Sequence, residues 1–310
     1  MVFGKTWERM NGMAGIKRSG NEMLFDILNY IILSLLAFST LYPFLIILST
    51  SLSSPAEATR AGLRLIPGQL NLNAYINILK NDYLLLAYRN TIIRTVIGTL
   101  FNVLLTVMTA YPLSKKDLPK RNLWTSIIVF TMFFSSGLIP NYILVYSLGL
   151  TNKIWALILP GAINTYTMII VRNFFMSLPA ALEESAKLDG ANDIRILFQI
   201  ILPVSASIVA TITLWYSVAH WNAWFDALIY ITKDNMIVLQ VLLRKMVIEG
   251  SAQYMGLTGN AGEMMAQDTT PTPDIIKSAA IMASSIPIIM VYPFIQKYFI
   301  KGIMVGSLKG

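Results

Sequence analysis

The chain has 310 residues, of which 55% are hydrophobic and only 13% charged, and its mean hydropathy is +0.60. A soluble domain carries about 25% charged residues, so this composition indicates a protein embedded in a membrane. The sequence has no cysteine and a single histidine, His220, which excludes disulfides, thiolate metal sites and His-cluster metal sites. The net charge of +8 fits basic loops that meet anionic lipid headgroups, so membrane lipid rather than nucleic acid is the expected partner.

Six apolar stretches follow one another along the chain, and each is long enough to cross a hydrocarbon core of ~30 Å as a helix. A polar N-terminal segment, residues 1–24, precedes them and does not resemble a cleavable signal peptide. A transmembrane domain is therefore expected over 25–300, with a short tail at 301–310. The predicted spans cover residues 25–48, 91–113, 124–148, 154–176, 203–231 and 278–300. We predict a kink in the third span at Ser135-Ser136-Gly137 and Pro140.

The polar segments between the spans predict the orientation of the chain. The short loop 114–123 is strongly basic, and lysine and arginine mark cytoplasmic loops. Both termini and the segment 177–203 then lie in the cytoplasm. The loops 50–88 and 233–277 lie outside, the first with a short helix near Tyr75–Lys80 and the second with Gly-rich and Pro-rich stretches typical of turns.

The segment 178–203, between the fourth and fifth predicted spans, predicts a helix, a sharp turn and a second helix. Residues 180–187 are rich in alanine and glutamate, which favour helix, and Pro179 is tolerated in a first turn. Gly190 suits the left-handed conformation that ends a helix, and Asn192 can cap the next one. Small residues such as Ala186, flanked by acidic ones, would let another protein approach closely.

This segment resembles the EAA loop of ABC importer permeases, which reads Glu-Ala-Ala, three residues, Gly, nine residues, Ile, one residue, Leu-Pro. The departure is Ser185, which stands where the first alanine is usual. The matching positions here are Glu184, Ala186, Gly190, Ile200, Leu202 and Pro203, with Asp189-Gly190-Ala191 similar to the family's usual Asp-Gly-Ala.

The resemblance extends over most of the chain. The chain resembles carbohydrate-uptake permeases, in particular the second permease subunit of maltose-type importers. Within these, it is most similar to permeases grouped with lipoprotein-linked polysaccharide uptake in Gram-positive bacteria. The resemblance is carried by residues 70–75 (LNLNAY), 110–114 (AYPLS), 138–140 (LIP), 148–150 (LGL), 172–175 (RNFF), 178–179 (LP), 221–224 (WNAW) and the tail 301–310. It implies an all-α membrane protein with six transmembrane helices and the ABC importer permease fold of the binding-protein-dependent type, in a bacterial cell membrane.

The resemblance also implies partners: a second homologous permease, a pair of ATPase subunits and an extracellular sugar-binding (lipo)protein. The sequence has no Walker motif, so this chain is expected to be a transport subunit and not an enzyme, with ATP and Mg held by the partner ATPase. In the family the EAA loop docks on the ATPase. The resemblance therefore assigns the coupling contact to Glu183, Glu184, Ser185, Ala186, Asp189 and Gly190.

A sugar path needs aromatic faces and polar groups at membrane depth, where polar groups are costly unless they face a cavity or a partner. Interfacial belts of Trp and Tyr and simple helix–helix hydrogen bonds are the alternative interpretation of the same residues. The candidates are Tyr142, Asn164, Tyr166, Asn173, Tyr216, His220, Trp221, Asn222 and Trp224.

Two other classes compete with an importer. A secondary transporter often has inverted repeats or paired charges inside its spans, and the sequence shows neither. An intramembrane enzyme needs convergent catalytic groups, and Asp226 with His220 are too few to indicate one. The identity, length and linkage of the sugar are not encoded in any motif.

Overall fold

The computed structural model describes residues 20–58, 65–134, 136–248, 250 and 271–307. Most of the predicted N-terminal segment 1–24, much of the predicted loop 233–277, Ser135 and the end of the tail lie outside the described residues. Within those residues the chain forms helices and turns and contains no strand.

Three helices are continuous and apolar enough to cross a membrane: α2 (Gly20–Ser51), α5 (Asp82–Ser114) and α16 (Pro273–Ser307), the last over Pro273–Met290. Three further spans are bent pairs. Helix α6 (Arg121–Phe133) meets α7 (Leu138–Ser147) at 112°, two 3-10 turns over Ile154–Gly161 meet α8 (Thr165–Met176) at 56°, and Asp193–Val204 meets α12 (Ala206–Asn222) at 88°. By length and composition this gives up to six spans, the number predicted.

Shorter elements connect the spans or lie at their ends. Helix α16 continues to Ser307, so the predicted tail begins as helix. The shorter elements are α3 (Pro55–Ala58), α4 (Asn73–Leu79), α9 (Ala181–Leu188), α10 (Asp193–Ile196), a π-helical stretch Leu197–Ile201, α11 (Leu202–Val204), α13 (Phe225–Tyr230), a 3-10 turn Asp234–Met236 and α14 (Leu239–Val247).

The third span is broken where a kink was predicted, whereas the fifth span is not the single helix that was predicted. The third span is interrupted at Gly137, whose φ of +83° is readily adopted by glycine, whereas Pro140 lies in the first turn of α7, where proline is tolerated. The predicted fifth span 203–231 is not one helix: α12 ends at Asn222, Ala223 is extended, and α13 follows from Phe225.

Helix α5 is at the centre of the bundle, in contact with α8, α12 and α14. Its buried stripe is polar, with Thr91, Arg94, Asn102 and Thr106 at helical spacing, whereas its exposed side is formed mainly of isoleucine, leucine, valine and methionine. A soluble helix shows the reverse pattern. An apolar outer surface over a polar interior is typical of a helix whose outer side meets lipid.

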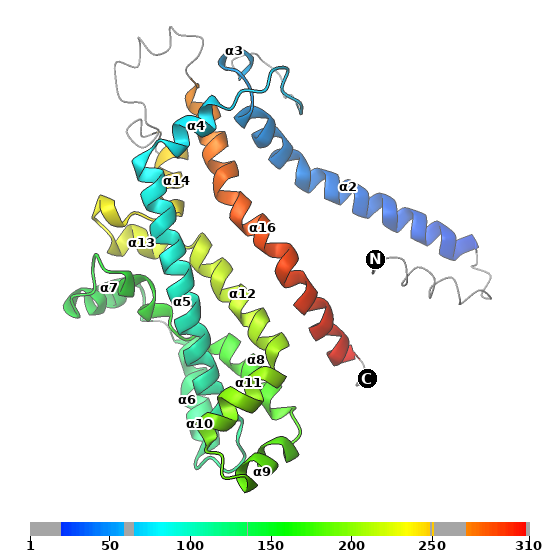
Figure 1. Ribbon diagram of the computed structural model, residues 1–310, viewed down its shortest axis with the longest axis vertical. Helices are drawn as coiled ribbons and strands as arrows, with labels where there is room; N and C mark the ends of the chain where they lie inside the picture. Colours follow the sequence, from blue (N-terminus) through cyan, green and yellow to red (C-terminus); the bar gives the residue numbers. More distant parts are fainter. Residues whose placement is uncertain (1–19, 59–64, 135, 249, 251–270, 308–310) are drawn as a thin grey trace.

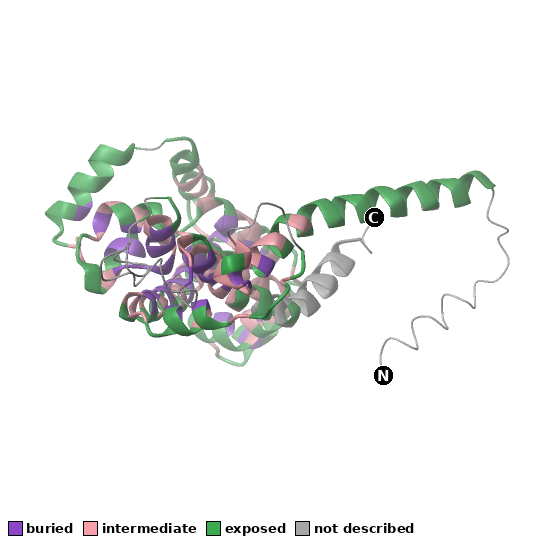
Figure 2. Ribbon diagram, turned by 90° about the horizontal axis from the view of Figure 1, so that it is seen from above, coloured by how far each residue is buried: buried purple, intermediate pink, exposed green. Residues whose placement is uncertain are grey.

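The molecule is elongated, with α9 at one end and α3 and α4 at the other (Figure 1). These are called the α9 end and the α4 end below. Two hydrophobic clusters form the interior: one joins α4, α14 and the start of α16 near the α4 end, and the other joins α5, α8, α9 and α10 near the α9 end. Helix α2 contacts α16 but is exposed along nearly all its length (Figure 2).

Candidate functional site

The segment 178–203 adopts the predicted helix, turn and second helix. Helix α9 ends at Leu188, and Gly190, two residues further on, has a φ of +75°. The amide of Gly190 donates to the carbonyl of Lys187 at 3.0 Å, and the amide of Ala191 donates to the carbonyl of Ala186 at 3.0 Å. This is the Schellman pattern of a glycine-terminated helix. The Asn192 side chain then accepts from the amide of Arg195 at 2.8 Å and caps α10.

The side chains of the six residues assigned to the coupling contact do not all lie on the same side of the segment. Glu184, Ser185, Asp189 and Gly190 are exposed at the surface of the α9 end. Ala186 is only 6% exposed and packs into the hydrophobic cluster of this end, so its small side chain brings α9 close to its own chain rather than to a partner.

Leu188 was not predicted to contribute, yet it is 90% exposed. It lies four residues after Glu184 and so on the same face of α9. Its side chain is therefore accessible beside Glu184 to any protein that docks on this face of α9. The signal in the sequence was a lone leucine between Lys187 and Asp189, which helical spacing places beside Glu184.

Glu183 points back toward the chain and forms an ion pair with Lys115, the residue that follows α5. The Lys115 ammonium also lies over the ring of Tyr111, 4.0 Å from its centroid. Burial first, and then the charge of Lys187, lower the pKa of the Lys115 amine to about 8, while nearby aspartates act in the opposite direction. A cavity of about 240 Å³ beside this pair is lined by the end of α5, the loop after it, Lys187 and Asp193.

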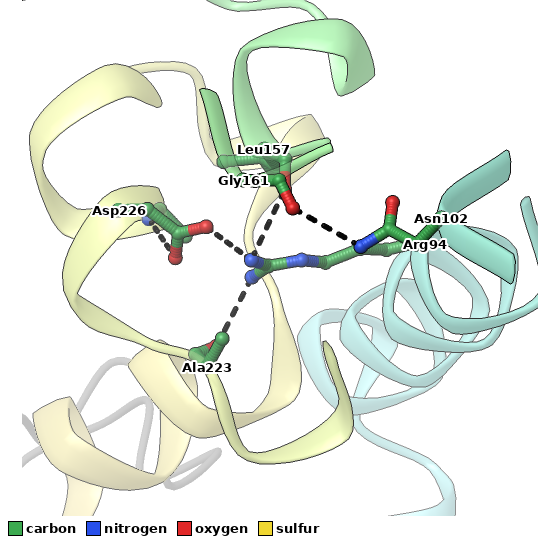
Figure 3. A network of polar contacts seen from close by, with 7 residues as sticks. Arg94, Asn102, Leu157, Gly161, Ala223 and Asp226 are labelled. Atoms are coloured by element: carbon green, nitrogen blue, oxygen red, sulfur yellow. Dashed lines mark hydrogen bonds and ion pairs between the residues drawn. The ribbon is translucent and has the colours of Figure 1, made fainter. Parts of the chain in front are cut away.

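Arg94, in the middle of α5, is 2% exposed and forms an ion pair with Asp226 (Figure 3). Its guanidinium also donates to the carbonyls of Ala223 at 3.1 Å and Leu157 at 3.4 Å. The same stretch of α5 reaches Gly161 through the Asn102 amide at 3.2 Å. The network ties α5 to two broken places in the neighbouring spans, where helix breaks leave carbonyls free to accept.

This network corrects one expectation. The sequence showed no paired charges inside the spans, but Arg94 and Asp226 come from the second and fifth predicted spans and pair across 132 positions. A paired charge therefore does not by itself separate a secondary transporter from an importer here.

Three candidates for the sugar path are buried inside the chain. The Tyr216 hydroxyl pairs with that of Thr106 at 2.7 Å. His220 lies against Gly98, where an added Cβ would come within 2.5 Å of its Nε2 atom. Trp221 lies 6.4 Å from the Tyr88 ring and lines an apolar hollow of about 320 Å³, a lining poorly suited to sugar hydroxyls. Tyr216 thus ties α12 to α5, whereas Nε2 of His220 and Nε1 of Trp221 are buried without a hydrogen-bond partner among the described residues.

The other six candidates lie on the surface of the chain and in several elements. Tyr142 stacks on Tyr230 at 6.1 Å, and the Trp224 ring lies 4.8 Å from the guanidinium carbon of Arg244. Asn164 accepts from the Thr167 amide and caps α8. The candidates with exposed positions are Tyr142, Asn164, Tyr166, Asn173, Asn222 and Trp224. They do not converge on one pocket within this chain.

Over the described part of the chain, no group of three or more His, Asp or Glu residues could hold a metal ion. The described residues offer two features instead: an exposed charged helix at one end and an interior held by polar contacts.

An all-α bundle with a lipid-type exterior and an EAA-like helix at one end defines the membrane subunit of a transport system. The chain belongs to the family described as binding-protein-dependent transport system inner membrane component, which matches residues 83–305. The predicted family, fold class and transport function are thereby confirmed: the chain is a sugar-type ABC importer permease.

Relatives and a solved structure agree. The chain is 42% identical over 287 residues to the polygalacturonan/rhamnogalacturonan transport system permease protein YtcP of Bacillus subtilis, covering 93% of this chain and 99% of that protein. It is 40% identical to the protein LplC of the same organism, covering 93% of this chain and 95% of that protein. A crystal structure of a bacterial ABC transporter involved in the import of the acidic polysaccharide alginate matches with a TM-score of 0.84 and 34% identity, over 92% of this chain and 100% of that one.

Proposed function

We propose that this permease forms half of the path of an ATP-driven oligosaccharide importer and couples to a separate ATPase through α9. The observation that carries the proposal is the arrangement of α9: one side is anchored to its own chain through Ala186, and the other presents Glu184, Leu188 and Asp189 at one end of the molecule (Figure 1). ATP and Mg belong to the ATPase in this proposal, and this chain is not an enzyme.

A second homologous permease completes the path. The exposed positions of Tyr142, Tyr166, Asn222 and Trp224 support this, because the hydroxyl, amide and indole N–H groups of these side chains are costly in hydrocarbon and favour a water-filled path or a partner. The nearly complete exposure of α2 leaves room for both lipid and a partner chain.

The α9 end faces the cytoplasm, and the segments near α4 and α14 meet an extracellular sugar-binding protein. Support comes from charge: Lys116 and Lys120 are exposed in the basic loop, which an ion pair joins to α9. Because the chain has no cysteine, orientation can be tested with single-cysteine variants. A membrane-impermeant maleimide should label Leu70→Cys in intact cells and Lys116→Cys only after lysis; the reverse labelling would overturn this orientation.

The substrate that we propose is an oligosaccharide, with fragments of uronate-rich polysaccharides as the first to test. The names of a relative and of a solved structure mention polygalacturonan and alginate. In this chain an exposed ring, Trp224, lies beside the positive charge of Arg244, which suits a sugar that carries a carboxylate.

The test is the ATPase activity of the reconstituted complex of two permeases, ATPase pair and binding protein. Polygalacturonan and alginate fragments would be compared with neutral malto-oligosaccharides. Stimulation by one loaded binding protein, lost in Glu184→Lys and Leu188→Ser without loss of assembly, supports the proposal. Uptake that proceeds with no ATPase bound would overturn it.

A further inference from the structure

The end of α5 and the first turn of α9 are in contact. Lys115 and Glu183 are 68 positions apart, and their side chains form an ion pair that leaves only 17% and 22% of each exposed. The ammonium also has the Tyr111 ring beneath it at 4.0 Å. A carboxylate and an aromatic face therefore hold the same cation from two sides.

Neighbouring contacts make this junction stiff. Tyr111 meets Phe175 of α8 edge to face at 6.3 Å, and the Arg172 side chain donates to the Leu113 carbonyl at 2.9 Å. On the other side of the ion pair, Ala186 is buried in the cluster that also contains Tyr111 and Phe175. The end of α5 is thus fixed to α8, and α9 is fixed to the end of α5.

Another ion pair at this end differs in kind. Lys187 and Asp193 lie 3.9 Å apart with 49% and 69% of their side chains exposed, so solvent screens the pair and it can open freely. The Lys115–Glu183 pair is the more enclosed of the two and joins the end of α5 to the 178–203 segment, whereas the exposed pair stays within that segment.

We propose that Lys115 is a positioning residue that fastens α9 to the end of α5 through Glu183, so that a displacement of α9 is transmitted to the central helix of the bundle. The proposal rests on the proposed function, in which the ATPase displaces α9. Glu183 then acts inward, as an anchor, while Glu184 and Leu188 act outward. Helix α5 carries the movement to α8 and α12, with which it is in contact.

A charge exchange in the reconstituted complex tests the pair. Lys115→Glu and Glu183→Lys should each lower the stimulation of ATP hydrolysis by loaded binding protein by about five- to tenfold, a coupling energy of ordinary size for linked sites, with basal hydrolysis retained. The double exchange Lys115→Glu/Glu183→Lys should restore most of it. The matched control is Lys116→Glu, an exposed neighbour with the same charge change, which should leave the stimulation unchanged.

Single variants that stimulate like the wild type, or a double exchange that rescues nothing, would overturn the proposal. If the wild-type complex itself shows no stimulation, the proposed function fails instead. The two failures are therefore distinguishable in the same assay.

A second experiment does not depend on the single variants folding. Lys115→Cys/Glu183→Cys would carry the chain's sole cysteines and can be joined by a bis-methanethiosulfonate linker that reductant removes. With the two cysteines joined by the linker, loaded binding protein should stimulate ATP hydrolysis by the assembled complex. After reductant removes the linker, this stimulation should fall about five- to tenfold. The stimulation of each single-cysteine variant should not change with reductant. Equal coupling before and after reduction, or a joined complex that fails to couple, would overturn the proposal.

Discussion

The α9 end and the middle of the bundle hold their charges in different ways. At the α9 end, Lys115 and Glu183 form a pair in which about a fifth of each side chain is exposed. In the middle, Arg94 is 2% exposed and is held by Asp226 and two backbone carbonyls. Water can reach both side chains of the first pair, whereas in the second it reaches the Asp226 carboxylate, which is 30% exposed, but not the Arg94 guanidinium.

This difference suits two mechanical roles. A partly hydrated junction can transmit a load and readjust, while a buried cation such as Arg94 is costly unless its carboxylate and carbonyl partners stay in place. In the proposed function, the middle of α5 is the fixed part of the molecule, and the α9 end is the part through which the ATPase acts. The predictions that follow test this comparison.

The largest expected effect is at Arg94. Arg94→Met should lower the free energy of unfolding by about 3 kcal/mol, because it leaves the carbonyls of Leu157 and Ala223 without their donor and the partly exposed Asp226 carboxylate without its cation. Thermal unfolding of the purified complex in detergent measures the change. Arg89→Met, at an exposed position of the same helix, is the control and should unfold near the wild type. If Arg94→Met and Arg89→Met unfold at the same temperature, Arg94 does not hold the middle of α5 in place.

The next effect concerns the close approach of α5 and α12. Gly98→Ala would place a Cβ 2.5 Å from Nε2 of His220 and 2.9 Å from its Cδ2, and the buried ring has little room to move. Overpacking of this kind costs about 1–3 kcal/mol of unfolding free energy. Gly161→Ala, with nothing within 4 Å of the added atom, is the matched control. In a His220→Ala background the Gly98→Ala change should cost much less; an undiminished cost would mean that His220 is not the obstacle.

The same two regions differ in how far the sequence predicts them. The helix, glycine turn and cap of the 178–203 segment depend on contacts within six consecutive positions, so residue types at fixed spacing determine them. The contacts in the middle join residues 132 and 110 positions apart, as in Arg94–Asp226 and Thr106–Tyr216. The spacing of residues along the sequence does not indicate which of these residues contact one another. Polar residues were recognised there, but which of them face a path and which tie helices together depends on the packing of spans.

A smaller effect is expected at the turn after α9. Gly190 has a φ of +75° and nothing within 4 Å of an added Cβ, so a substitution there is opposed by the backbone conformation alone. Gly190→Ala should cost roughly 1–2 kcal/mol locally, and Gly190→Asn less, because asparagine tolerates the left-handed region. Hydrogen exchange at the amides of Gly190 and Ala191, which close this turn, measures the loosening. Equal exchange in wild type and both variants would contradict it.

The smallest effect is a shift on the pH axis, and it belongs to the α9 end because water reaches Lys115. Burial and the charge of Lys187 lower the pKa of the Lys115 amine to about 8, and the Glu183 carboxylate favours the charged form, so the midpoint lies at this value or above it. The lysine is charged below the midpoint and neutral above it. The charged or titratable groups around it are Tyr111, Asp117, Arg121, Glu183, Lys187 and Asp193.

Stimulation of ATP hydrolysis should therefore decline as the pH rises through about 8 and beyond, because the ion pair with Glu183 loses its cation. Lys115→Arg keeps a positive charge over this whole range, since a guanidinium does not deprotonate there, and should hold the stimulation to higher pH. The measurement is the ratio of stimulated to basal hydrolysis in each complex at matched pH values, which cancels the pH response of the ATPase itself. Identical profiles for wild type and Lys115→Arg would mean that the charge of Lys115 does not carry the coupling, and that the junction acts through packing of Ala186 and Tyr111 instead.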